Sequence, residues 1–441
     1  MTVTTFKPQT FKPETAAQAA EAVRWALSEG EPLDVTGTGS KRGLGRPMQT
    51  AYTLDLSGLN GVVAYEPEEL VLTAQAGTPM AVILPMLEER RQQLAFEPQD
   101  LGPLFGQPEG QGTLGGVLAC GLAGPRRISA GSARDHALGM EGVNGRGEVY
   151  KGGGKVVKNV TGYDVPKLMA GSFGTLTALT EVTVKALPAP EDTRTLVLTG
   201  RDDTGAVDAL TRAMQSPYEV SGAAHLPAGV AARSAVRDVA GAGAAVTLVR
   251  LEGFGPSVTA RVAALKEELG ADAVLDRDAS RTVWREIRDV RFFSPLPNPP
   301  PLGGGGNSAA VSDSPISLPR PAGEGRGGGE VPHIWKLSVP PATGPTVAAA
   351  IRDRLDAELY FDWAGGLIWM SVPPAPDAAA AIRGALNGSG HATLVRAPDD
   401  VRASADVFHP LAEPVMALSR RVKDSFDPRG ILSPGRMYAG V

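Results

Sequence analysis

The feature that most constrains this chain is a succession of three glycine-rich segments between Gly112 and Pro188. A fourth segment precedes them, and the four read Gly37-Thr-Gly-Ser40, Gly112-Thr-Leu-Gly-Gly116, Lys151-Gly-Gly-Gly-Lys155 and Gly171-Ser-Phe-Gly-Thr-Leu176. Glycine lets a backbone approach a ligand closely and adopt dihedral angles that are closed to other residues. Because strand-like stretches separate the segments, the pattern favours a backbone cradle for a large cofactor that carries phosphate groups.

The chain has 441 residues, enough for two or three domains. Its 43 basic and 48 acidic residues nearly balance, so the net charge gives no argument for a nucleic-acid partner. Cys120 is the single cysteine, which excludes an internal disulfide and a cysteine-ligated metal cluster within this chain. Residues 1–8 lack the apolar core of a signal peptide, and no apolar run is long enough for a transmembrane segment. We therefore expect a cytoplasmic protein whose membrane association, if any, is peripheral or through a partner.

Residues 1–190 are predicted to form a mixed α/β domain rich in short strands. Apolar residues at helical spacing predict three helices, over 13–29, 79–91 and 113–122. Shorter apolar stretches predict strands over 32–36, 52–56, 61–65, 70–74, 137–143, 148–150 and 179–186. The pattern changes after Pro188, which places a domain boundary near residue 190.

Residues 191–441 are predicted to form a second domain of the α+β class together with a C-terminal segment. Strands and helices alternate as split βαβ units, over 195–275 and again over 334–395, which is typical of an antiparallel sheet covered by helices. Residues 294–332 interrupt this pattern with many prolines and glycines, and such a segment cannot bury enough apolar surface to offset the entropy of ordering. We interpret it as a disordered insertion, with a proline-rich docking segment for a partner as the alternative.

The first glycine segment, Gly37–Ser40, matches neither of two common phosphate-binding motifs. A Rossmann fingerprint must open a helix after its strand, whereas Gly37–Gly43 is followed by Leu44–Pro47 and then by a strand. A P-loop needs a lysine followed by Ser or Thr at the end of a glycine loop, and no segment has that spacing. A nest of backbone N–H groups that binds pyrophosphate remains, beside the alternative of an ordinary tight turn. At Gly112–Gly116, the N–H groups of a helix start would suit an anion, and close helix packing is the alternative.

Taken together, these segments resemble a known family. Residues 13–188 resemble the FAD-binding domain of the vanillyl-alcohol oxidase and p-cresol methylhydroxylase (PCMH-type) flavoproteins, through Val35–Ser40, Gly112–Gly116, Gly131–Asp135 and Gly171–Thr175. Within this superfamily the chain is most similar to the FAD-binding E subunits of bacterial glycolate oxidases. That similarity extends over most of the chain and is carried by Gly124–Arg127, Gly153–Asp164, Trp335, Asp362-Trp363, Trp369 and Phe426–Tyr438.

The resemblance implies an α+β protein, with an FAD-binding domain of two α/β subdomains followed by a ferredoxin-like cap domain. It also implies a set of residues that bind the cofactor. Gly37, Thr38, Gly39 and Ser40 would hold the FAD pyrophosphate, and Thr113, Gly115 and Gly116 would form a second contact on the phosphate side. Gly131 would approach the flavin or its ribityl chain, and Gly174, Thr175 and the backbone near Val182 would line the cofactor. The family often has glycine where this chain has Thr177.

The positions of the histidines bear on how FAD is attached and on whether the chain has a catalytic metal site. Some relatives attach FAD through a histidine in the first glycine segment, and because none is present here we expect non-covalent FAD. Catalytic relatives carry a histidine-rich metal and substrate site in the second domain. The five histidines of this chain are widely separated and match no such pattern, so we expect no metal site and identify no catalytic residue. His136 is expected to serve as a packing residue.

A polar cluster at Lys158, Asn159, Tyr163 and Asp164, with the pair Arg126-Arg127, could orient the flavin or a substrate carboxylate. The favoured alternative is a hydrogen-bonded brace of the cofactor domain, because buried polar groups need partners in any case.

The resemblance implies that this chain is the FAD-binding subunit of a glycolate oxidase complex, which would oxidise glycolate to glyoxylate by hydride transfer to the flavin. The resemblance implies two partners, a sister FAD-binding subunit that holds the small 2-hydroxy acid and an iron–sulfur subunit that takes the electrons onward. The alternatives are a self-sufficient FAD-dependent oxidoreductase of 2-hydroxy acids and a non-catalytic structural subunit. The missing histidines disfavour the first alternative, and the intact glycine segments disfavour the second.

Overall fold

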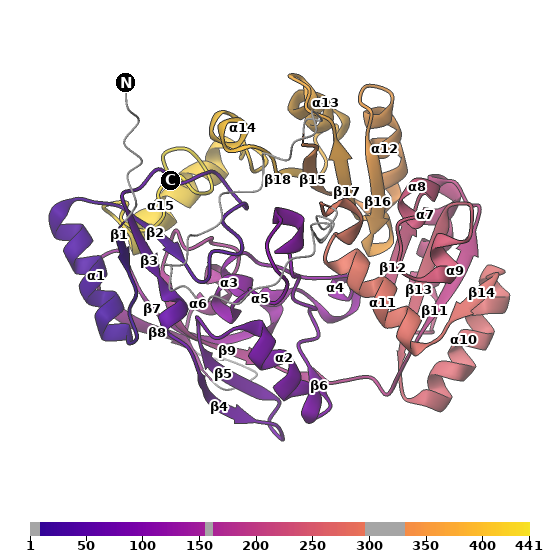
Figure 1. The fold of residues 1–441 in the computed structure, drawn as a ribbon, viewed down its shortest axis with the longest axis horizontal. Coiled ribbons are helices and arrows are strands. Elements are labelled where there is room, and N and C mark those ends of the chain that lie inside the picture. The colour runs from indigo at the N-terminus through magenta and orange to yellow at the C-terminus, as the bar shows by residue number, and fades with distance from the viewer. Residues whose placement is uncertain (1–8, 155–161, 296–330) are drawn as a thin grey trace, which may run out of the picture.

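The computed structural model describes residues 9–154, 162–295 and 331–441. Its first half contains a parallel three-stranded sheet in the order β1-β3-β2 and an antiparallel five-stranded sheet in the order β4-β5-β9-β7-β8 (Figure 1). These strands are β1 (Gln9–Phe11), β2 (Leu33–Thr36), β3 (Tyr52–Asp55), β4 (Val62–Glu66), β5 (Val71–Gln75), β7 (Ala137–Val143), β8 (Val149–Gly153) and β9 (Ala178–Lys185). The two sheets confirm the predicted mixed α/β region with two subdomains.

Helix α1 (Ala16–Glu29) shows why the predicted helices form where they do. The Thr15 hydroxyl accepts the backbone N–H of Gln18 at the start of the helix, and Gly30 ends it in the left-handed conformation at φ 73°. Its small buried face, centred on Val23, belongs to one apolar cluster with Leu33 of the small sheet. The helix therefore covers one face of that sheet. The other helices of this half are short, namely α2 (Met80–Glu89), α3 (Leu114–Ala119), α4 (Arg127–Ala130), α5 (Ala133–His136) and α6 (Val165–Met169).

The second half is built on an antiparallel sheet of eight strands in the order β14-β11-β13-β12-β16-β17-β15-β18. Two βαββαβ units share this sheet, and they meet where β12 and β16 pair at His225 and Phe361. The strands are β11 (Asp192–Thr199), β12 (Val220–Leu226), β13 (Val246–Gly253) and β14 (Ala273–Leu275), then β15 (His333–Ser338), β16 (Glu358–Asp362), β17 (Leu367–Val372) and β18 (His391–Arg396). Each unit has the strand order of a ferredoxin-like fold, which confirms the predicted α+β cap.

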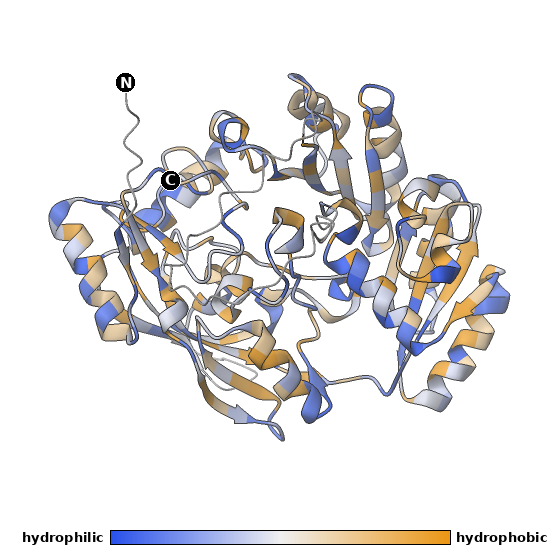
Figure 2. Cartoon of the chain, in the orientation of Figure 1, coloured by the Kyte–Doolittle hydropathy of each residue, from blue (hydrophilic) through white to orange (hydrophobic). Residues whose placement is uncertain are grey.

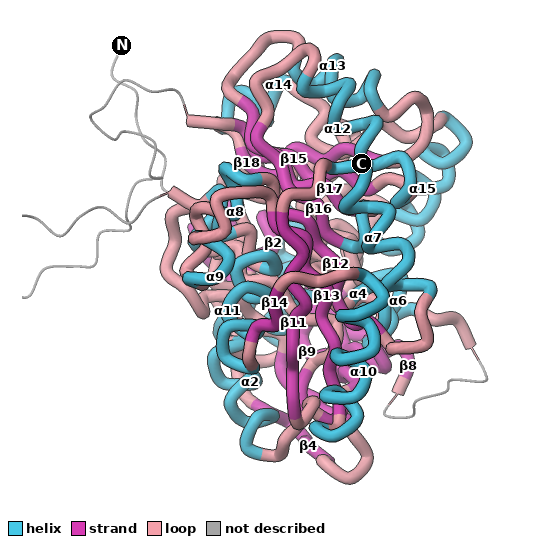
Figure 3. Tube along the Cα trace, turned by 90° about the vertical axis from the view of Figure 1, so that its right-hand side faces the viewer, coloured by secondary structure: helices cyan, strands magenta, loops and turns pink. Residues whose placement is uncertain are grey.

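Helices cover one face of this sheet, and the other face packs on the first half of the chain. Helices α7 (Asp203–Gln215) and α10 (Gly255–Leu269) cover the first unit, and α12 (Gly344–Arg352) and α13 (Ala378–Ala385) cover the second. On the opposite face, Leu248 and Trp369 join the largest apolar cluster, which they share with Leu94 and Leu122 of the first half. Figure 2 shows the apolar residues concentrated on the strands and on the inner helix faces, and Figure 3 shows the strands running through the middle of the molecule. One continuous core thus joins the two halves.

Two longer helices of the second half were not predicted, α11 (Arg277–Arg288) and α15 (Glu413–Phe426). The segment after α15 returns to the first half, where the N–H of Leu33 donates to the carbonyl of Ile431 at 2.8 Å. The C-terminal segment that we grouped with the second domain therefore lies beside β2. The domain boundary near residue 190 stays a prediction. The predicted insertion falls mainly on residues 296–330, outside the described part of the chain. Within the described part, no helix combines the length and apolar character needed to cross a membrane.

Candidate functional site

Most of the predicted cofactor-binding residues surround one hollow in the first half of the molecule. Its walls come from the loop after β2, the start of α3, the turn before β9 and the C-terminal segment. Eight predicted residues line it, namely Gly37, Thr38, Gly39, Ser40, Thr113, Gly115, Gly116 and Gly174. Segments far apart in the sequence therefore meet at one concave site, which is where cofactors commonly bind.

The loop after β2 is held close to the start of α3. A Cβ added to Gly37 would lie 2.7 Å from the Thr113 hydroxyl oxygen, so only glycine fits there without displacing that side chain. Gly39 has a φ of 77°, in the left-handed region that favours glycine. No regular helix follows the loop before β3, which confirms that the segment is not a Rossmann fingerprint. The glycines at 37 and 39 are therefore required by geometry, not simply tolerated in a turn.

The two neighbouring glycines of α3 face different surroundings. A Cβ on Gly115 would lie 2.7 Å from the Cβ of Ala76, so this residue packs closely against its neighbour while also lining the hollow. Gly116 lines the hollow as well, and an added Cβ there would lie 3.6 Å from the Nζ of Lys41. The Thr113 hydroxyl caps the helix by accepting the Gly116 N–H at 3.2 Å.

Three cationic side chains line the hollow, and the prediction missed all of them. Lys41 and Arg42 follow the first glycine segment, and Arg436 enters from the C-terminal segment. The Arg436 guanidinium donates to the carbonyls of Arg42 at 3.1 Å and Lys41 at 3.3 Å, which fixes it against the loop. Burial lowers the pKa of Lys41 and that of Arg436, and such a shift favours a site completed by an anion. The charge and the close backbone suit a pyrophosphate.

Cys120 and Asp34 are groups that could reduce the positive charge of the hollow. Cys120 lines the hollow, and burial raises the pKa of its thiol, so the group stays neutral near pH 7. The Asp34 carboxylate pairs with Arg42 at 3.2 Å. The pairing leaves Lys41 and Arg436 as the cations available to a bound anion.

The glycine segment Gly171–Leu176 is hydrogen-bonded to the end of α3. The N–H of Gly171 donates to the carbonyl of Leu118 at 3.0 Å, and the N–H of Phe173 donates to that of Ala119 at 2.8 Å. Phe173 and Gly174 both line the hollow and both have positive φ angles, 55° and 73°. The turn therefore brings the start of β9 to the cofactor side of α3.

Three predicted residues do not line the hollow. Thr175 is buried and donates its hydroxyl to the carbonyl of Ser172 at 2.7 Å, so it braces the turn. Val182 is fully buried within β9, and Gly131 ends α4 at φ 85°. Their contact with FAD stays a prediction. Thr177, which stands where the family often has glycine, does line the hollow.

The predicted polar cluster is only partly described. Lys158 and Asn159 lie outside the described residues. Tyr163 is 92% exposed, and Asp164 pairs with Lys167 at 2.6 Å. The described members of this cluster therefore do not converge on the hollow.

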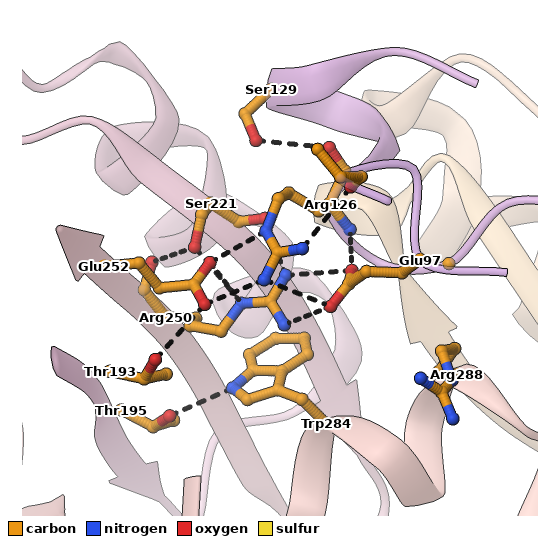
Figure 4. A network of polar contacts seen from close by, with 12 residues as sticks. Glu97, Arg126, Ser129, Thr193, Thr195, Ser221, Arg250, Glu252, Trp284 and Arg288 are labelled. Carbon is orange, nitrogen blue, oxygen red and sulfur yellow. Dashed lines mark hydrogen bonds and ion pairs between the residues drawn. The ribbon is translucent and has the colours of Figure 1, made fainter. Parts of the chain in front are cut away.

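Arg126 belongs to a buried charge network between the two halves (Figure 4). Its guanidinium pairs with Glu252 of β13 at 2.9 Å and with Glu97 at 3.4 Å. Arg250, on the same strand as Glu252, donates to Glu97 at 2.8 Å. Although burial opposes ionisation, the two guanidinium groups lower the pKa of Glu97 and hold that of Glu252 at about 2. The network supports the brace interpretation for Arg126.

The histidines occupy separate structural positions. His136 is buried, contacts the Phe96 ring at 5.3 Å and places its Nε2 2.8 Å from the Ala130 carbonyl, which fits the expected packing role. His225 is buried between Thr247 and Asp203. Among the described residues, no group of three or more His, Cys, Asp or Glu side chains is arranged to hold a metal ion.

Comparisons with known proteins agree with this geometry. Residues 8–153 match the family model described as "FAD binding domain". The chain is 33% identical over 424 residues to glycolate oxidase subunit GlcE of Escherichia coli (strain K12), covering 95% of this chain and 96% of that one. It is 32% identical over 151 residues to glycolate oxidase subunit GlcD of Bacillus subtilis (strain 168), covering 34% and 30% of the two chains. The crystal structure of p-cresol methylhydroxylase with bound substrate has the same fold, with a TM-score of 0.65, 16% identity and coverage of 98% of this chain and 88% of that chain.

Proposed function

Because this chain belongs to the family of the glycolate oxidase subunit GlcE, we propose that it is the FAD-binding subunit of a complex that oxidises glycolate to glyoxylate. The observation that carries the proposal is the hollow where two glycine segments and a glycine turn meet three cationic side chains. When bound, FAD would supply a two-electron acceptor for the oxidation of an alcohol carbon to a carbonyl.

The residues of the hollow fit this cofactor. Gly37 and Gly39 bring backbone close to the bound group, and Lys41 with Arg436 would neutralise its pyrophosphate. The lining holds no histidine, which supports non-covalent attachment. Gly131, Thr175 and Val182 are retained in the proposal as residues near the flavin end, as the family resemblance implies.

Two partner subunits complete the proposal. The family name describes a subunit, and GlcD is named as a subunit of the same kind of oxidase. We propose that a sister FAD-binding subunit and an iron–sulfur subunit join this chain, which has only Cys120 and cannot ligate a cluster through its own cysteines. A cytoplasmic location, at the inner membrane through the complex, belongs to the same proposal.

A matched pair of glycine variants tests the cofactor site. Gly116→Leu would place a side chain into the hollow beside Lys41, whereas nothing lies within 4 Å of a Cβ on Gly384 in α13. We expect the parent chain and Gly384→Leu to retain flavin and Gly116→Leu to lose it. The measurement is the flavin absorbance per chain after purification, with circular dichroism to confirm that each variant is folded. Equal flavin content in folded Gly116→Leu would contradict the assignment.

A further inference from the structure

The segment between β16 and β17 holds a tryptophan in an unusual backbone conformation. Trp363 and Ala364 have φ angles of 51° and 56°, and two successive non-glycine residues in the left-handed region are rare. Strain of this kind persists where the surroundings determine it, often at functional sites. Here the Trp363 Nε1 donates to the Gly124 carbonyl at 3.2 Å, so the indole is fixed against the first half of the molecule.

Two cations lie near this one indole ring. The Cζ of Arg127 is 4.4 Å from the Trp363 ring centroid, and the Nζ of Lys336 is 5.5 Å from it. Arg127 is on α4 of the first half, and Lys336 is on β15 of the cap sheet. Arg127 is exposed and Lys336 is partly exposed. Each half of the molecule thus contributes one cation to the same indole ring.

These cations are not neutralised within the described part of the chain. There, neither side chain makes a hydrogen bond or ion pair, although Lys336 also lies 5.7 Å from the Trp369 ring. A cation–π contact favours one cation near the ring, but a second like charge near the same ring is repelled by the first. Burial and the Arg127 charge accordingly lower the pKa of Lys336 to about 8.

The carboxylate that acts on Lys336 is Asp362, and it compensates the charge only in part. Its Oδ1 accepts the Trp363 N–H at 2.7 Å, and burial raises its pKa to about 7. Near pH 7 this group is therefore partly protonated. The neighbouring charges that act on Asp362, Glu97 and Arg250, are paired with each other. A net positive charge remains between Arg127 and Lys336.

We propose that Arg127 and Lys336 bind the carboxylate of a small 2-hydroxy acid beside the Trp363 indole. The proposal rests on the proposed function for its ligand class. It differs from the expectation that a sister subunit alone holds the substrate. The position supports it, because α4 ends at Gly131, the residue that the family resemblance places beside the flavin.

Glycolate binding to the full-length chain tests the proposal. Binding is measured by titration calorimetry and by tryptophan fluorescence, with oxalate as a non-oxidisable probe and neutral ethylene glycol as a control solute. We expect glycolate and oxalate to bind, and ethylene glycol not to. Lys336→Met and Arg127→Gln should each weaken carboxylate binding about tenfold or more, since each removes a charged partner. Lys336→Arg should retain most of it, and Lys266→Met on the exposed face of α10 should change nothing.

Proton uptake provides a second readout that a structural role would not produce. A bound carboxylate raises the pKa of Lys336 and of Asp362, so binding between pH 7 and 8 should take up protons. Glu97, whose pKa is lowered, stays ionised in this range. Calorimetry in buffers of different ionisation enthalpy measures the uptake, and Asp362→Asn should reduce it at pH 7.

Unchanged affinity in both Lys336→Met and Arg127→Gln would overturn the proposal. A parent chain that retains FAD but does not bind glycolate or oxalate would also overturn it, while leaving the proposed function intact. Loss of flavin from the parent chain would instead count against the proposed function, so the flavin content of each sample is measured alongside binding.

Discussion

At the scale of single residues, the Lys423 ammonium joins three separate parts of the chain. It donates to the Asp427 carboxylate at 2.7 Å, to the Thr175 carbonyl at 2.7 Å and to the Leu432 carbonyl at 2.8 Å. Thr175 belongs to the glycine segment Gly171–Leu176, and Leu432 forms a parallel bridge with Leu33 of β2. One buried side chain thus ties the C-terminal segment to the turn that lines the cofactor hollow.

Lys423→Met tests this role. The change keeps the aliphatic stem but leaves the Asp427 carboxylate, which is 1% exposed, without its cation. Breaking a buried pair in this way costs about 3–5 kcal/mol, and we expect the free energy of unfolding in urea to fall by about that amount. Lys266→Met, at an exposed position, provides the control. A change in Lys423→Met no larger than in the control would show that the pair adds little.

The site residues that the sequence revealed are those whose chemistry is local. Gly37 and Gly39 could be identified because they stand close together in a short motif after a predicted strand. Arg436 could not, since it is 395 residues from the carbonyl of Lys41 that it contacts. Thr175 lies in a recognisable motif, but its hydroxyl braces the turn, a distinction that only the folded backbone reveals.

At the scale of elements, the two adjacent glycines of α3 differ in how closely they pack. Gly115 packs against Ala76 of the five-stranded subdomain, and its N–H donates to the Ala76 carbonyl at 2.8 Å. Both glycines line the hollow, but only an added Cβ on Gly115 would meet backbone. The start of the short helix is thus fixed against the five-stranded subdomain at the edge of the hollow.

Gly115→Ala should therefore destabilise the protein. Its methyl group would meet Ala76 backbone at 2.8 Å, and forcing such overpacking costs about 1–3 kcal/mol. Urea denaturation measures the loss, with Gly384→Ala in α13 as the control. If Gly115→Ala is as stable as the control, α3 packs less closely than the structure indicates.

The predictable elements were those with strong periodicity or clear end signals. Helix α1 has a threonine cap and a terminal glycine, and the sheet strands are apolar. Helix α11 escaped prediction because charged residues occupy half of its positions, beside a buried stripe of Val283, Trp284 and Ile287. Helix α15 packs Val422 and Phe426 against the largest apolar cluster, but Lys423 is its only buried residue, so its apolar stripe is weakly marked.

At the scale of the whole molecule, the network of Glu97, Arg126, Arg250 and Glu252 fixes the cap sheet against the first half. Glu97 and Arg126 come from the first half, and Arg250 and Glu252 come from β13. The pKa of each carboxylate is lower in the folded protein than its ordinary value of 4.5. Its contribution to stability is therefore fully present above about pH 4.5 and is lost as the pH falls through the folded pKa, about 2 for Glu252.

Glu97→Gln should lower the free energy of unfolding near pH 7. It should also make that free energy depend less on pH in acid. The variant leaves Arg250, which is 2% exposed, with one carboxylate fewer, and we expect a loss of about 3 kcal/mol. The free energy of unfolding measured between pH 7 and 2.5 should fall less steeply below pH 4.5 than in the parent. Glu267→Gln on α10 is the control. If the free energy of unfolding of Glu97→Gln falls with pH as steeply as that of the parent, the network does not lower the pKa of Glu97.

The central claim is that this chain binds FAD non-covalently in the hollow formed by its glycine segments. Titration of the flavin-free chain with FAD, followed by denaturation and analysis of the released flavin, tests this claim most directly. The account predicts saturation at one FAD per chain, full release of intact FAD on denaturation, and much weaker binding by Gly116→Leu. A folded chain that binds no FAD, or a flavin that stays attached after denaturation, would contradict it.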